Sequence, residues 1–170
     1  EAWCRPEDYA SSSWWNPGWG TTGDGHLMGI QVGAQMDPCP QPVMNFRWGS
    51  PDSFYDSRAW GAISIAILVN GDGNRFVRED LPFQPVSNAQ NAQPDYGANC
   101  WAVFDETMMG GMDDAAVEDY AGRGWLFEGA TPEELAAACG MNPEGLSATI
   151  GRYNDFFKKG IDEDFDRDLS

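Results

Sequence analysis

The sequence predicts an α+β fold: a small mixed domain with a β-hairpin or short sheet and a pair of C-terminal helices. Apolar runs on either side of a Gly-rich turn predict strands between residues 62 and 79. Two successive helix-start signals predict helices between residues 131 and 160. Strand and helix patterns do not alternate along the chain, which excludes a doubly wound parallel sheet.

The composition is that of an acidic globular domain. Of 170 residues, 42% are hydrophobic and 13% are aromatic, which is enough for one core. The 27 acidic residues against 10 basic ones give a formal net charge of −17, so we expect no nucleic-acid partner. No apolar run reaches the length of a membrane span. The chain starts at Glu1 without an initiator Met or a signal-peptide pattern, so we expect a processed or excised fragment.

A Gly-rich turn followed by a helix is predicted near the N-terminus, within a tryptophan-rich stretch that reads as ordered loop. The helix covers residues 26–36, with Leu27, Ile30 and Ala34 at helical spacing and Asp24 as the N-cap. The backbone N–H groups at such a helix start attract an anionic or oxygen-rich ligand. An ordinary capped helix is the alternative.

The middle of the chain predicts a hairpin and then a loop. The hairpin has strands over residues 62–69 and 75–79, joined by a turn over residues 70–74. The turn imitates the start of a calcium-binding loop, but Arg75 stands where the required Gly would be, which excludes an EF-hand. Residues 81–99 show no periodicity, so we expect a loop that crosses a surface or a cleft.

Two shorter elements follow. Residues 100–104 predict a strand that ends at two acidic residues. A short helix is predicted from Asp113 to Tyr120, with Gly122 and Gly124 after its end.

The C-terminal third predicts two helices in succession. Thr131 and Glu134 form a capping box for the first helix, which ends at Gly140. Asn142 begins the second helix, and Gly160 ends it. An apolar stripe on the second helix is predicted to face the core: Leu146, Ile150, Tyr153 and Phe157.

The remaining polar residues do not assemble a catalytic or metal site. His26 is the single histidine, and no triad can be built around it. Five carboxylates between residues 162 and 168 predict a solvated tail, with a calcium-bound structural domain as the lowest-ranked alternative. The cysteines form no Cys-x-x-Cys pair, which disfavours a zinc site: Cys4, Cys39, Cys100 and Cys139. Free thiols are the simpler expectation for a chain with its own core, and disulfides are the alternative if the protein is exported.

The order of these segments is itself a pattern. It resembles the FAD-dependent fumarate reductase and succinate dehydrogenase flavoprotein family. The resemblance begins with a Thr-Gly-Asp-Gly motif at the start of the first helix. It then runs through segments spread over almost the whole chain: 22–25, 67–77, 101–105, 131–136, 145–154 and 160–165.

The resemblance implies a division of labour within a longer chain. Residues 1–40 would be the loop and helix that border an FAD-binding domain, and residues 41–170 would be the capping domain that covers the substrate. The sequence lacks both halves of the family's FAD fingerprint, including Gly-x-Gly-x-x-Gly. We therefore expect FAD in the intact parent protein and an FAD-binding domain of the same parent chain as partner. This part alone is expected to be inactive and not to retain FAD.

The resemblance also implies cofactor contacts and a substrate preference. Asp24 matches a position that contacts FAD in the family, flanked by Thr22, Gly23 and Gly25. The family's substrate histidine is absent, since residues 42–45 read Pro-Val-Met-Asn. Carboxylate clamps need cationic or hydrogen-bonding groups, whereas aromatic and amide groups stand at these places: Asn45, Trp48, Trp60 and Phe83.

These replacements favour a less charged, more apolar organic substrate than fumarate. The expected activity is reduction or dehydrogenation at a carbon–carbon bond, with the hydride carried by the flavin. The main alternative is a freestanding binding module for carbohydrates or peptides, which would use Trp14, Trp15 and Trp19 as an aromatic platform.

Overall fold

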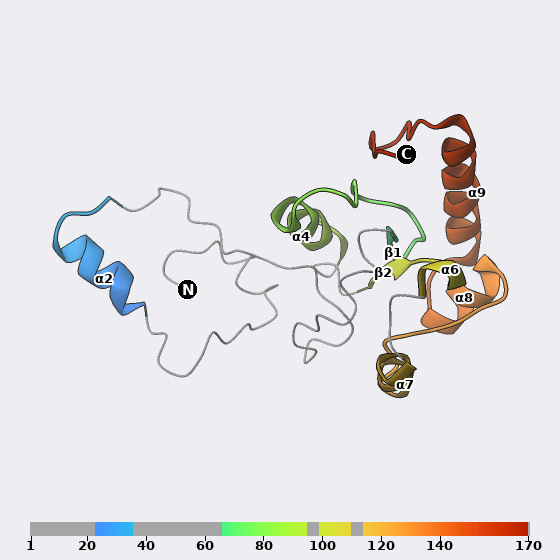
Figure 1. The fold of residues 1–170 in the computed structure, drawn as a ribbon, viewed down its shortest axis with the longest axis horizontal. Coiled ribbons are helices and arrows are strands. Elements are labelled where there is room, and N and C mark those ends of the chain that lie inside the picture. Colours follow the sequence, from blue (N-terminus) through green and yellow to red (C-terminus); the bar gives the residue numbers. More distant parts are fainter. Residues whose placement is uncertain (1–22, 36–65, 95–98, 110–113, 170) are drawn as a thin grey trace.

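The computed structural model describes residues 23–35, 66–94, 99–109 and 114–169 (Figure 1). Helices and a two-stranded antiparallel sheet are both present in this part of the chain, which confirms the α+β class. The described elements are α2 (Asp24–Gln31), β1 (Ile67–Asn70), α4 (Phe83–Asn91), β2 (Cys100–Val103), α6 (Glu106–Met109), α7 (Asp114–Gly122), α8 (Pro132–Cys139) and α9 (Pro143–Lys159).

The sheet pairs β1 with β2, not with the segment that follows the Gly-rich turn. The register places Ile67 opposite Val103 and Asn70 opposite Cys100. The predicted hairpin is confirmed for residues 67–69 of its first strand and for its turn, where one antiparallel bridge joins Val69 to Arg75, but its second strand is wrong, because residues 76–79 form no strand. The second strand does not develop there because a side chain occupies the edge of β1: the Glu79 carboxylate accepts the N–H of Leu68 at 3.1 Å.

The expected loop over residues 81–99 contains a helix, α4, so that prediction is wrong for residues 83–91. The helix starts after Pro82, whose fixed φ is compatible with a helix start. Its buried positions are Val86, Ser87 and Gln90, two of them polar. Its apolar positions on the core side are Val86 and Ala89, and this short pattern stands beside Pro82 and Pro85, which are typical of turns, so the sequence did not reveal the helix.

Both C-terminal helices are confirmed, together with their caps. The Thr131 hydroxyl accepts the N–H of Glu134 at 3.2 Å, and the Asn142 side chain accepts two N–H groups of the first turn of α9. Gly140 and Gly160 end the helices in the left-handed conformation, with φ of 76° and 72°. The helix predicted from Asp113 is confirmed as α7, and α8 packs against α9.

The core lies on both faces of β1. Ile67 and Val69 point toward α8 and α9, where they pack with Leu146. Leu68 points to the opposite face and packs with Val86 of α4. Figure 1 accordingly shows β1 between α4 on one side and α8 and α9 on the other. A strand that is buried on both faces reads as a continuous apolar run, as residues 66–69 do.

The apolar stripe of α9 is confirmed for its first turns and wrong at its end. Leu146 is fully buried, but Phe157 is 64% exposed and its neighbour Phe156 is only 2% exposed. The last turns of α9 extend beyond the sheet and face the returning C-terminal residues instead. There the guanidinium of Arg152 lies 4.8 Å from the centre of the Phe156 ring.

The turn over residues 70–74 docks on the start of α9. Gly73 has φ +79°, and a Cβ there would collide with the backbone of Leu146. A Cβ at Gly145 would collide with the carbonyl oxygen of Asp72, so the two backbones approach as closely as glycine allows. The N–H of Asn142 donates to the carbonyl of Gly71 at 2.9 Å, which fixes the contact.

The described part of the chain holds neither a membrane-spanning helix nor a cluster of metal ligands. None of the helices is long and apolar enough to cross a membrane. In the same part of the chain, no three His, Cys, Asp or Glu side chains are placed to hold a metal ion. Cys139 is a free thiol, as expected, whereas Cys4 and Cys39 lie outside the described residues.

Candidate functional site

The predicted cofactor contacts lie at the start of α2. Gly23 is the N-cap, with φ +82° and no side-chain cap hydrogen bond, and its carbonyl accepts the N–H of His26 at 3.0 Å. The expectation that Asp24 caps the helix is therefore wrong, because a left-handed cap favours Gly and places Asp24 inside the first turn. Thr22 lies outside the described residues. The predicted helix also ends earlier, at Gln31.

The start of α2 fits one side of a large anionic cofactor. Asp24 and Gly25 are exposed, and open space surrounds the positions that a Cβ would occupy at Gly23 and Gly25. The free N–H groups and the positive end of the helix dipole favour oxygen-rich or phosphate groups there. However, none of the residues of α2 is buried, so this helix supplies one wall of a site and not an enclosure.

The predicted substrate residues are only partly placed. Phe83 is the first residue of α4, directly after Pro82, and its side chain lies outside the described part of the structure. Asn45, Trp48 and Trp60 lie outside the described residues, as do the tryptophans of the alternative aromatic platform. Figure 1 shows α2 and α4 apart, so the described residues do not form one joint site from the predicted cofactor and substrate positions.

The most organised polar site in the described part of the chain is a buried cluster of four charges, which the sequence analysis did not predict. Arg75 lies at its centre. Its Nε and Nη2 donate to the two oxygens of Glu79 at 2.9 and 2.8 Å. Its Nη1 and Nη2 donate to the two oxygens of Asp162 at 3.2 and 2.9 Å. The fourth member, Arg167, donates from Nη1 to Glu79 at 3.1 Å. We call these four residues the charge cluster.

Aromatic rings enclose the central guanidinium. The ring centres of Tyr153 and Phe165 lie 4.7 and 5.0 Å from Cζ of Arg75, within the range of cation–π attraction. Burial by itself would lower the pKa of Arg75, but the hydrogen bonds and charges of Glu79 and Asp162 raise it above its ordinary value. The central cation is therefore permanently charged and cannot act as an acid or a base near neutral pH.

The expected solvated tail is wrong at its start. Asp162 is 3% exposed. Burial acts to raise the pKa of this carboxyl, but the hydrogen bonds from Arg75 and from two backbone N–H groups hold the pKa below its usual range. Arg75 and Asp162 are 87 residues apart in the sequence, so no local pattern predicts their ion pair. The available signal was an arginine within an acidic, aromatic-containing tail.

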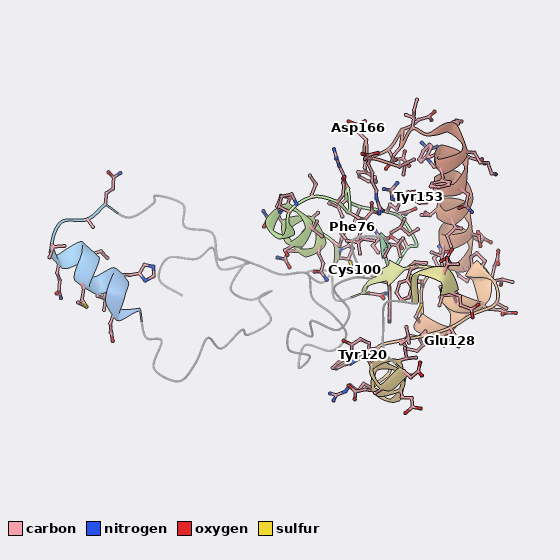
Figure 2. All side chains as sticks on the ribbon, viewed as in Figure 1. Phe76, Cys100, Tyr120, Glu128, Tyr153 and Asp166 are labelled. Atoms are coloured by element: carbon pink, nitrogen blue, oxygen red, sulfur yellow. The ribbon has the colours of Figure 1, made fainter. Side chains whose placement is uncertain are left out.

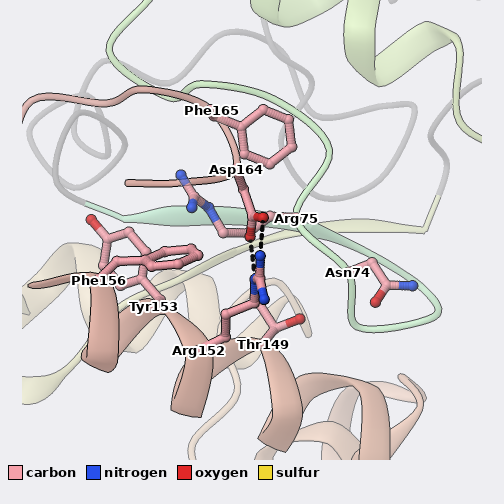
Figure 3. Close-up of a pocket in the computed structure, with 8 residues that line it drawn as sticks. All are labelled: Asn74, Arg75, Thr149, Arg152, Tyr153, Phe156, Asp164 and Phe165. Carbon is pink, nitrogen blue, oxygen red and sulfur yellow. Dashed lines mark hydrogen bonds and ion pairs between the residues drawn. The ribbon is translucent and has the colours of Figure 1, made fainter. Parts of the chain in front are cut away.

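A cavity of about 380 Å³ adjoins the charge cluster, between α9 and the C-terminal residues. Arg152 spans it, with bonds of 2.8 and 2.6 Å to the two oxygens of Asp164 (Figure 3). The guanidinium groups in its wall are thus neutralised by carboxylates of this chain. Its lining holds no histidine or cysteine, so the cavity offers no catalytic base or nucleophile of that kind: Asn74, Arg75, Thr149, Arg152, Tyr153, Phe156, Asp164 and Phe165.

Comparison with known proteins assigns the class of protein. The family model described as an FAD binding domain matches residues 2–169. The chain therefore belongs to this family of FAD-dependent flavoproteins, and the predicted family and its cofactor, FAD, are confirmed.

The relatives are larger oxidoreductases. The chain is 28% identical to a 3-oxosteroid 1-dehydrogenase of Mycobacterium tuberculosis, covering 86% of this chain and 28% of that protein. It is 32% identical to a probable fumarate reductase of Shewanella frigidimarina, covering 86% of this chain and 24% of that protein. A urocanate reductase of Eggerthella lenta is 27% identical over 86% of this chain and 25% of its own length. The chain thus spans about a quarter of the length of these relatives.

Solved structures agree with this assignment. The open conformation of a flavocytochrome c3 fumarate reductase matches 86% of this chain and 25% of its own, with 31% identity and a TM-score of 0.58. A 3-ketosteroid Δ1-dehydrogenase from Sterolibacterium denitrificans matches 97% of this chain and 32% of its own, with a TM-score of 0.69. At 22% identity, the latter likeness supports the fold alone.

Proposed function

We propose that this chain is the capping, substrate-side part of an FAD-dependent oxidoreductase that acts at a carbon–carbon bond of an organic substrate. The main support for the proposal is that the chain matches only a small part of each longer relative. Of this chain, 86% aligns with the 3-oxosteroid 1-dehydrogenase and with the probable fumarate reductase, but the aligned part is only 28% and 24% of their lengths. The helix α2 supports it as well, because its large apolar side chains Leu27, Met28 and Ile30 are exposed and would be covered by another part of the protein. That other part is the FAD-binding domain.

The chemistry of the proposed activity belongs to the flavin. Bound FAD would carry the hydride, in the direction of a reductase or of a dehydrogenase. Residues of this chain would orient the substrate and exclude water from it. We assign cofactor contact to Thr22, Gly23, Asp24 and Gly25, and substrate contact to Asn45, Trp48, Trp60 and Phe83.

The charges of the described residues favour a substrate with less charge than a dicarboxylate. Anionic substrates need cations that are free to bind them. Every lysine and arginine in the described ranges forms an ion pair with a carboxylate of this chain: Arg75, Arg78, Arg123, Arg152, Lys158, Lys159 and Arg167. We therefore propose a substrate other than fumarate.

Spectroscopy and turnover test this function. The 170-residue chain and the intact gene product that contains it are purified in parallel. We expect flavin absorption only in the intact protein, and turnover of uncharged unsaturated compounds or their saturated forms, not of fumarate. An intact protein without flavin whose tryptophan fluorescence responds to carbohydrates would replace the proposal with the binding module. Turnover of fumarate alone would refute the substrate assignment and leave the flavoenzyme intact.

The assignment of Asp24 has its own test. Asp24→Ala in the intact protein is expected to lower FAD retention by about tenfold, the value of one hydrogen bond to a charged group. Flavin content after extensive dialysis measures the loss. Asp155→Ala, which removes an exposed carboxylate from α9, is the matched control and is expected to retain FAD. Equal flavin content in both variants would remove Asp24 from the cofactor site.

A further inference from the structure

The last described residues, 161–169, turn back from the end of α9 and run toward β1. We call this segment the strap. Asp162 organises its first turn, because its Oδ1 accepts the N–H of Asp164 at 3.1 Å and of Phe165 at 3.3 Å. Its carbonyl accepts the N–H of Asp166 at 3.0 Å. Figure 2 shows Tyr153 on the side of α9 that faces the strap, and Asp166 at the outer edge of the strap.

The charge cluster fastens the strap at two points. Asp162 near the start of the strap binds Arg75, and Arg167 near its end binds Glu79. The four side chains are between 0% and 8% exposed, and two positive charges face two negative ones. Burial without exact pairing is costly, so the strap is held only while each charge has its partner.

The same cluster holds β1. The Glu79 carboxylate accepts the N–H of Leu68 at 3.1 Å, and Arg167 donates to the carbonyl of Ala66 at 2.8 Å. Ala66 and Arg167 are 101 residues apart. The first residue of the body formed by residues 66–169, Ala66, therefore lies beside Arg167 near its last residue.

Apolar packing contributes less to the strap than to the rest of this body. Ile161 is 61% exposed and Phe165 is half-buried. In contrast, β1, α8 and α9 share a core in which Val69, Ala136 and Leu146 are fully buried. Segments with few buried apolar contacts open at lower free energy than a core does. Buried ion pairs therefore hold the strap in place, whereas apolar packing holds β1, α8 and α9 together.

We propose that the strap is a clasp: the charge cluster closes it, it joins the two ends of the 66–169 body, and it opens as a local unit while α8 and α9 stay folded. Closure fixes the place from which any earlier and later parts of the protein extend. The proposal depends on neither the cofactor nor the substrate.

Hydrogen exchange of the 170-residue chain tests the clasp. The reporters are the amides of the strap that bond to Asp162: Asp164, Phe165 and Asp166. Arg167→Gln removes the link to Glu79 and Ala66. We expect the reporters to exchange about 10- to 100-fold faster in this variant, with the interior amides of α8 and α9 unchanged.

Arg152→Gln is the matched control, because Arg152 binds the strap at Asp164 through an exposed ion pair. We expect its reporters to stay within about threefold of the wild type. Arg167→Lys keeps the charge, but its side chain ends one bond short of Nη1, the atom that donates to both acceptors, so we expect an intermediate acceleration. Wild-type exchange of the reporters in Arg167→Gln would overturn the proposal. Loss of protection in α8 and α9 in step with the strap, or failure of this variant to fold, would overturn it too.

Discussion

At the scale of single residues, the few buried charges have a large effect on the stability of the fold. Glu79 has a fully buried side chain that neutralises Arg75 and Arg167 and also accepts the N–H of Leu68. Removing its charge leaves two buried guanidinium groups with one carboxylate between them. Breaking a buried pair in this way costs far more than the pair contributes relative to an apolar replacement.

We therefore expect Glu79→Gln to lower the free energy of unfolding by about 3 to 5 kcal/mol. Denaturation in urea, followed by tryptophan fluorescence, measures the change. Asp80→Asn is the matched control, because Asp80 binds Arg78 through a pair in which both side chains are about one-third exposed. It is expected to cost less than about 1 kcal/mol. Equal losses in the two variants would contradict a special role for the cluster.

Prediction from the sequence fails at this scale for a physical reason. Arg75 and Asp162 meet only through the tertiary structure, because they are 87 residues apart and nothing near either residue in the sequence specifies the other. The position of Asp24 shows the complementary case. Its place in the first turn of α2 was close to the prediction, because helix caps are local, and the error was a single residue.

At the scale of elements, local signals were reliable and non-local ones were not. The helices α8 and α9 follow from their caps and glycines, which lie within a few residues of each boundary. The partner of β1 does not, since β2 lies thirty residues further along and competes with a nearer candidate. The helix α4 was missed because Ser87 and Gln90 occupy its buried face. Its apolar pattern, Val86 and Ala89, is too short to stand out beside these polar residues.

The cap of α9 gives a prediction for one element. Asn142 accepts two N–H groups of the first turn, from Glu144 and Gly145, at 3.0 and 3.1 Å. Asn142→Ala leaves both without this partner and is expected to lower the free energy of unfolding by about 1 kcal/mol. Thermal unfolding followed by circular dichroism measures it. Asn154→Ala, at an exposed position within α9, is the control and is expected to be neutral or slightly stabilising.

At the scale of the whole molecule, the net charge of −17 contrasts with the neutral interior of the clasp. Most of the carboxylates in the described residues are exposed and repel one another, so protonating them in acid relieves repulsion. Asp162 acts in the opposite direction, because its bonds to Arg75 stabilise the fold only while it is ionised. The pH dependence of the whole chain is therefore a sum of opposing contributions, and the part due to Asp162 must be isolated by a variant.

The comparison of wild type with Asp162→Asn isolates it. The pKa of Asp162 is lower in the folded chain than in the unfolded one, so its contribution is present above the unfolded pKa of about 4 and is lost as the pH falls through the folded pKa. Asparagine keeps an oxygen that can accept the N–H groups of Asp164 and Phe165 but carries no charge. We expect the wild type to be more stable than the variant at pH 7. The difference should shrink steadily below pH of about 4. Unfolding in urea at a series of pH values measures it, and a difference that stays constant down to the most acidic point would show that the ionised carboxylate does not hold the clasp.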